Sequence, residues 1–172
     1  MNTLKKLTLL AQVLRDVRDS DSKSLEIGTE GTEYACGQAA CVMGWACASG
    51  VFHELSIEIF GEGEEWTLIR KHSDGKERCT TWDDVGVNYF GLTPVETDML
   101  GSSSRENRNH AFGLWVRWLP VMKRLEMGLA CNFEDPFEET TKPRHFISHT
   151  PTENDALAVV LLLIENYTVE AP

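Results

Sequence analysis

The sequence lacks the features that mark several large classes of protein. Its longest uninterrupted apolar run, from Ala156 to Ile164, has nine residues, about half of the roughly 20 that a membrane-spanning helix needs. Its five cysteines are an odd number, so a fully paired disulfide framework within one chain is excluded and a reducing compartment is expected. Its 16 basic residues are outnumbered by 27 acidic ones, and the resulting net charge of −11 repels nucleic acid and anionic membranes.

The sequence also lacks the short motifs that carry well-known chemistry. It has no phosphate-binding Gly-rich loop, no His-Glu-x-x-His, no Gly-x-Ser-x-Gly and no deaminase pattern. A signal peptide is not expected either, because Gln12 interrupts the apolar stretch that follows the first lysines and Arg15 comes soon after. Missing motifs do not exclude an enzyme, since paired carboxylates need no local pattern. We therefore expect a cytoplasmic protein without a cofactor, and a binding protein rather than an enzyme.

What the sequence does contain is the composition of one globular domain. Its 172 residues are 42% apolar and 25% charged, as in ordinary domains with a single core. We expect one domain over residues 1–172. Apolar residues at spacings of three and four predict an amphipathic helix over residues 3–19. The polar residues that follow predict a loop through Glu33.

Residues 55–81 carry the pattern of a small antiparallel sheet. Strand-like runs at 65–71 and 77–80 flank an Asp74-Gly75 step, which is a strong hairpin signal. A preceding run from Leu55 to Phe60 alternates apolar and polar residues and predicts a third strand.

Capping boxes mark four helix starts in the second half of the chain. In each, Ser or Thr is followed three positions later by an acidic residue, so that the two side chains cap each other's amides. The pairs are Thr81/Asp84, Thr93/Glu96, Ser103/Glu106 and Thr150/Glu153. They predict helices near 82–90, 94–100, 104–127 and 151–167, with Gly91 and Gly101 ending the first two and a long loop over 131–149. The predicted fold is therefore α+β and dominated by helices, with five or six helices and a small antiparallel β-hairpin or three-stranded sheet.

The most distinctive segment runs from Cys36 to Gly50. We interpret it as a short, buried helix with Gly50 as a left-handed C-cap. The run C-G-Q-A-A-C-V-M-G-W-A at 36–46, followed by G-L-T-P-V-E at 91–96, resembles a loose group of small uncharacterised bacteriophage proteins that share a C-G-x-x-x-C-x-x-G-W helix. The chain departs from that group at Gln38, Met43 and Thr97. The resemblance implies phage origin and a helical core, and no site residues follow from it.

The cysteines offer two chemical alternatives. Cys36, Cys41 and Cys47, together with His145 and His149, are candidate zinc ligands. Cys36 at a helix start is a candidate reactive thiol, because the helix dipole lowers a thiol pKa. Successive cysteines of one helix would point about 120–140° apart, however, and buried cysteine commonly packs as a small apolar group. Core packing is the preferred interpretation, and a small zinc-stabilised or cysteine-dependent enzyme is the alternative.

Two nucleic-acid hypotheses also arise from charge. Residues 105–124 are locally basic and contain Trp115 and Trp118, which resembles the composition of a single-strand platform. The same tryptophans fall on a core-facing helical stripe, and this argues against nucleic acid as a partner. An acidic nucleic-acid mimic is a further alternative, although the acidic residues are dispersed and a net charge of this size is an ordinary aid to solubility.

Residues 111–122 have more apolar surface than one core-facing stripe requires. Because the apolar run after Ala156 competes for the central position, one of these two helices is expected to form an oligomer or partner interface. The candidate binding residues are Leu114, Arg117, Val121 and Arg124. We predict a non-enzymatic phage accessory protein in the host cytoplasm that binds a host protein, with inhibition of a host defence system as one such role. A homo-oligomer is left open, and no membrane is involved.

Overall fold

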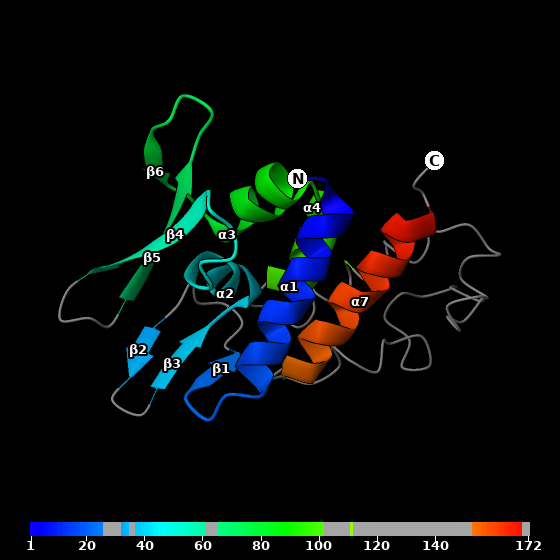
Figure 1. The fold of residues 1–172 in the computed structure, drawn as a ribbon, viewed down its shortest axis with the longest axis horizontal. Coiled ribbons are helices and arrows are strands. Elements are labelled where there is room, and N and C mark those ends of the chain that lie inside the picture. The colour runs from blue at the N-terminus through cyan, green and yellow to red at the C-terminus, as the bar shows by residue number, and fades with distance from the viewer. Residues whose placement is uncertain (26–31, 35–36, 61–64, 102–110, 112–152, 170–172) are drawn as a thin grey trace.

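The computed structural model describes residues 1–25, 32–34, 37–60, 65–101, 111 and 153–169. These residues form an α+β fold dominated by helices (Figure 1), as the sequence predicted. The five described α-helices are α1 (Thr3–Arg18), α2 (Val42–Ala48), α3 (Trp82–Asp84), α4 (Pro94–Gly101) and α7 (Glu153–Val169). A π-helical turn, η1 (Val85–Phe90), continues α3.

The strands form one mixed sheet. They are β1 (Lys23–Leu25), β2 (Thr32–Tyr34), β3 (Gly37–Ala40), β4 (Leu55–Phe60), β5 (Glu65–Lys71) and β6 (Glu77–Cys79). The predicted three-stranded antiparallel sheet is β4, β5 and β6, and the predicted turn contains Gly75 at φ +78°. One edge of β5 pairs with β4. Its other edge pairs with β2 at Glu65 and with β6 from Ile69 onward, which joins the predicted sheet to β3 and β1.

Two local predictions were wrong. The stretch predicted as a loop through Glu33 contains β1 and part of β2. The buried helix predicted from Cys36 begins at Val42, because residues 37–40 pair as strand β3 between β1 and β2. Cys41 is the N-cap of α2, where its Sγ accepts a hydrogen bond from the Gly44 amide at 3.3 Å. Residues Val42 to Cys47 of the helix are buried as predicted, Ala48 is half-buried, and Gly50 adopts the predicted left-handed conformation at φ +69°.

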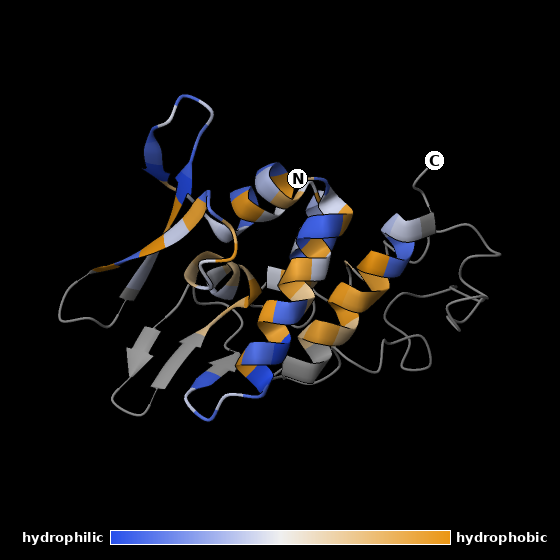
Figure 2. Cartoon of the chain, viewed as in Figure 1, coloured by the Kyte–Doolittle hydropathy of each residue, from blue (hydrophilic) through white to orange (hydrophobic). Residues whose placement is uncertain are grey.

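The core is built in sequence from the sheet outward: α2 packs on β4 and β5, α1 packs on α2 and β1, and α7 packs on α1. Helix α1 begins at the cap Asn2, whose side chain accepts from the Lys5 amide at 3.0 Å. Its apolar residues recur every three or four positions and turn one face, including Leu7 and Leu14, completely inward. Helices α1 and α7 lie side by side, and Figure 2 shows that polar and apolar residues alternate along α1 whereas most of α7 is apolar.

Among the described residues, no helix has the length and apolar character required to cross a membrane.

The capping-box prediction is confirmed at the start of α4. The Glu96 carboxylate accepts from the Thr93 amide at 2.8 Å, and the Thr93 hydroxyl accepts from the Glu96 amide at 3.2 Å. The predicted helix over 82–90 is present as α3 and η1, and it ends at Gly91 with φ +77°. The predicted helix over 104–127 and loop over 131–149 lie outside the described residues, apart from the buried Ala111.

Candidate functional site

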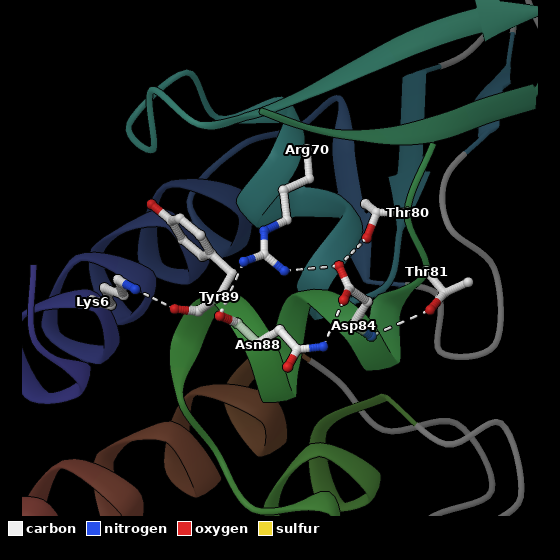
Figure 3. Close-up of polar contacts among 7 residues, drawn as sticks. All are labelled: Lys6, Arg70, Thr80, Thr81, Asp84, Asn88 and Tyr89. Atoms are coloured by element: carbon white, nitrogen blue, oxygen red, sulfur yellow. Dashed lines mark hydrogen bonds and ion pairs between the residues drawn. The ribbon is translucent and has the colours of Figure 1, made fainter. Parts of the chain in front are cut away.

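A cleft of about 500 Å³ opens where α1, the ends of β4 and β5, and η1 come together. Its charged and aromatic lining comes from four parts of the chain that are distant in sequence. Its larger polar side chains are those of Lys6, Glu54, Arg70, Lys71, His72, Asn88 and Tyr89. Figure 3 shows how several of these side chains converge around the end of η1. We call this the basic cleft.

The inner wall of the basic cleft is a chain of contacts around Tyr89. The Tyr89 hydroxyl donates a hydrogen bond to Glu54 Oε2 at 2.9 Å. The Lys6 ammonium donates to the Tyr89 carbonyl oxygen, and its Nζ lies 4.1 Å from the centroid of the Tyr89 ring. Burial and then the bond to Glu54 raise the pKa of Tyr89, whereas that same bond lowers the pKa of Glu54. Burial lowers the pKa of Lys6.

The outer wall is held by an ion pair between Arg70 and Asp84. Arg70 NH1 donates to Asp84 Oδ2 at 3.0 Å, and Arg70 NH2 donates to the Asn88 carbonyl oxygen at 3.2 Å. The Asp84 carboxylate also accepts from the Thr80 hydroxyl at 2.5 Å and from Asn88 Nδ2 at 2.7 Å. These bonds fix the end of β5 to the helical segment α3–η1. The two bonds that Arg70 donates engage two of the five N–H donors of its guanidinium.

Part of the positive charge in the cleft stabilises the fold. Lys6 and Arg70 both donate to carbonyl groups in the last turn of η1, where cations satisfy unpaired carbonyls and complement the negative end of the helix dipole. Lys71 is exposed and forms no ion pair within the described residues. The lining holds three lysine and arginine charges and the carboxylate of Glu54. Two further carboxylates adjoin it, because Asp84 is paired with Arg70 and Glu77 lies opposite Lys71 on β6.

The carboxylate of Asp84 makes this end of the cleft sensitive to acid. Burial by itself would raise the pKa of Asp84, but hydrogen bonds from Thr80, Asn88 and Arg70 outweigh burial and lower it. A carboxyl with a lowered folded-state pKa contributes stability above its unfolded value of about 4, and that contribution is lost as the pH falls through the folded value.

The variant Asp84→Asn is therefore expected to be less stable than the unmodified chain by about 1 kcal/mol at pH 7, after allowance for solvent screening. As the pH falls through the lowered pKa of Asp84 the two proteins are expected to converge, because a protonated Asp84 has lost its charge as well. Urea unfolding at pH 7 and at successively lower pH measures the difference in stability. A difference that stays constant over this series would show that the charge of Asp84 contributes nothing.

The structure changes which cysteine stands at a helix start and shows which of the described cysteines are buried. Cys41, not Cys36, is the cysteine at the start of α2, and both Cys41 and Cys47 are 2% exposed within the core. Cys79, on β6, is exposed. Cys36, Cys131 and the two candidate histidine ligands His145 and His149 lie outside the described residues. Within the described part of the chain, no three His, Cys, Asp or Glu side chains are grouped as metal ligands would be.

Burial predicts an order of thiol reactivity that alkylation can measure. Iodoacetamide is expected to modify Cys79 on the order of 100-fold faster than Cys41 or Cys47 in the folded protein, because a buried thiol reacts only after local opening. Peptide mass spectrometry over a time course, with and without urea, gives the rate for each site. Rapid native modification of Cys41 would contradict its place in the core and would support a cysteine-dependent activity.

The candidate binding residues predicted from the sequence, Leu114, Arg117, Val121 and Arg124, lie outside the described residues. The basic cleft was not predicted. Its residues share no local motif, because positions 6, 54, 70 and 89 meet only through the tertiary fold.

Comparisons of the chain with protein-family models, with curated proteins and with solved structures return no match.

Proposed function

We propose that this chain is a non-enzymatic accessory protein of a bacteriophage that acts in the host cytoplasm by binding a host protein. The observation that carries the proposal is the basic cleft, whose lining gathers three cations on a chain of net charge −11. One of the three, Lys71, is exposed. The resemblance of residues 36–46 to small phage proteins supports the biological setting.

The chemistry of the cleft favours an acidic segment of the partner. Among the described residues, three guanidinium N–H donors of Arg70 are not engaged in a hydrogen bond, and the planar fork of arginine suits a carboxylate. Lys71, which forms no ion pair in the described part of the chain, adds a second cation. At physiological ionic strength, charges more than about 8 Å apart are largely screened. The acidic residues elsewhere on the chain therefore oppose such a contact only weakly.

The same groups are poorly suited to acid–base catalysis. A general acid or base works best with a pKa near the operating pH. Here the pKa of Glu54 is lowered and that of Tyr89 is raised, so both of these shifts lead away from neutrality, whereas burial lowers the pKa of Lys6 toward it. The thiols of Cys41 and Cys47 are buried in the core. These features support a binding role in preference to an enzyme.

Charge reversal at one position of the β5–β6 hairpin tests the proposal. Lys71 and Lys76 are both exposed lysines of this hairpin, but only Lys71 lines the cleft. The tagged chain is expected to capture a host protein in stoichiometric amount. Lys71→Glu is expected to lower the apparent affinity about tenfold, because an attractive contact becomes a repulsive one. Lys76→Glu, the matched control, is expected to leave the affinity within twofold.

Equal capture by both variants would contradict docking at the cleft. Leu114→Asp and Val121→Asp test the apolar face predicted from the sequence in the same assay. Loss of capture in these two variants alone would move the docking site to residues 111–124. Recovery of the chain by itself in repeated experiments would contradict the binding function.

A further inference from the structure

Strand β4 ends the sheet on one side, and its outer edge faces away from β5. In the order of the strands it comes last, next to β5. The Lys71 amide donates to the Glu54 carbonyl oxygen at 2.8 Å. Because alternate residues of an antiparallel strand bond to each side, residues 54, 56 and 58 form the hydrogen bonds with β5. The backbone groups of residues 55, 57 and 59 therefore point to the outer edge.

Two residues of this edge are free to pair with another strand. The Leu55 amide is already engaged, because it donates to the Phe52 carbonyl oxygen at 2.9 Å. The amides and carbonyl groups of Ile57 and Ile59 have no partner on the outer side among the described residues. Such an edge is a template for an incoming strand, and β4 has none of the proline or lysine residues that commonly protect edges.

Apolar surface is exposed beside this open edge. Ile59 lies directly opposite Trp66 on β5, so the two side chains lie on the same face of the sheet. Trp66 is only 4% exposed, whereas Ile59 is 47% exposed. Val51, which lines one small cavity together with Ile57, is 38% exposed. A strand added at the edge would place alternate side chains on this face and cover the exposed surface of Ile59.

Glu58 selects the charge of an incoming strand. Its side chain lies on the other face from Ile57 and Ile59, because side chains alternate along a strand. Glu58 is exposed, lies opposite Thr67, and forms no ion pair among the described residues. A lysine or arginine opposite Glu58 would form a favourable cross-strand pair. A second copy of the chain is disfavoured, because the antiparallel self-pairing that uses both isoleucines sets two Glu58 carboxylates opposite each other.

We propose that the edge of β4 binds an extended segment of another protein as an additional antiparallel strand. The residues of the segment opposite Ile57 and Ile59 are apolar, and the residue between them, opposite Glu58, is lysine or arginine. Main-chain hydrogen bonds supply affinity, and the alternating side chains supply specificity. This strand is opposite in charge to the acidic segment proposed for the basic cleft, and it belongs to a separate partner. The site is independent of the function proposed for the cleft.

Labelled peptides with Val-Lys-Val at their centre test the proposal on the full chain. Fluorescence anisotropy is expected to show saturable binding of the unmodified peptide. N-methylation of both valines removes the two amides that face the edge, and it is expected to weaken binding about tenfold or more. N-methylation of the central lysine, whose amide points away from the edge, is the matched control and is expected to change the affinity less than about twofold. No saturable binding, or equal weakening by the two modifications, would overturn the proposal.

A neutral peptide and two variants test the role of Glu58. A peptide with Val-Thr-Val at its centre is expected to bind the unmodified chain about threefold more weakly than the lysine peptide. Glu58→Lys is expected to reverse this order. Glu77→Lys makes the same charge change at an exposed position of β6, and it is expected to keep the order. An order that Glu58→Lys leaves unchanged would overturn the assignment. Should a variant fail to fold, the N-methylated peptides on the unmodified chain still decide.

Hydrogen exchange locates the bound peptide. The lysine peptide is expected to slow exchange of the Ile57 and Ile59 amides and to leave residues 70–75, at the basic cleft, unchanged. Protection confined to residues 70–75 would overturn the proposal. Sedimentation tests the competing occupant, because a stable dimer of the chain that the lysine peptide dissociates would assign the edge to a second copy instead.

Discussion

Replacement of Phe90 with alanine is expected to lower the free energy of unfolding by about 3–5 kcal/mol, the usual cost of deleting a buried phenylalanine. Phe90 is completely buried at the end of η1. Its ring packs edge to face against Phe52 and Tyr89, with centroids 5.2 and 5.4 Å away. The loss is at least about a fifth of the stability of a typical domain, which is about 5–15 kcal/mol. It also removes support from Tyr89, which lines the basic cleft.

Urea unfolding of Phe90→Ala and Phe90→Leu measures this effect. The leucine variant keeps an apolar side chain in the cluster and is expected to lose about 1–2 kcal/mol. The slope of the free energy against urea should stay unchanged in both, since the surface exposed on unfolding is nearly the same. A loss below 1 kcal/mol in the alanine variant would show that the aromatic cluster is not part of the core.

Replacement of Gly86 with alanine is expected to destabilise the protein by about 2–3 kcal/mol. A Cβ at this position would lie 2.4 Å from Cγ2 and 2.5 Å from Oγ1 of Thr97. Thr97 is completely buried, and its hydroxyl donates to the Thr93 carbonyl oxygen at 3.1 Å, so it cannot turn away without losing that bond. Helix propensity alone predicts the opposite sign, a gain of about 1 kcal/mol for alanine in place of glycine.

A double-mutant cycle with Thr97→Ala separates the two explanations. Shortening Thr97 removes the two closest atoms, so Gly86→Ala is expected to cost at least 1 kcal/mol less in the Thr97→Ala background than in the unmodified chain. Thermal unfolding of the four proteins gives the coupling energy. Strict additivity, or stabilisation by Gly86→Ala alone, would contradict the close approach of η1 and α4.

The parts of the fold that could be predicted from the sequence are those set by neighbours along the chain. The Thr93/Glu96 capping box forms because its two residues are three positions apart and each supplies what the other's amide lacks. The Asp74-Gly75 turn forms because glycine accepts the positive φ that the hairpin requires. Neither feature depends on the rest of the molecule.

The parts that could not be predicted depend on distant partners. Residues 37–40 carry no alternating pattern, and they become a strand because β1 and β2 pair with both of its edges. Even Glu96, whose local role was predicted, also accepts a hydrogen bond from the Tyr167 hydroxyl at 2.9 Å, from a residue 71 positions away. The basic cleft belongs to this second class, because no local pattern relates Lys6 to Arg70 or Tyr89.

Hydrogen exchange on the complex with the captured host protein tests the docking claim most directly. If an acidic segment of the partner occupies the basic cleft, exchange of the backbone amides in residues 70–75 and 88–89 should slow on binding. The amides of residues 57–59, at the other end of β4 and outside the cleft, should change little and serve as the internal control. Slowed exchange confined to other surfaces, with residues 70–75 and 88–89 unchanged, would contradict the account.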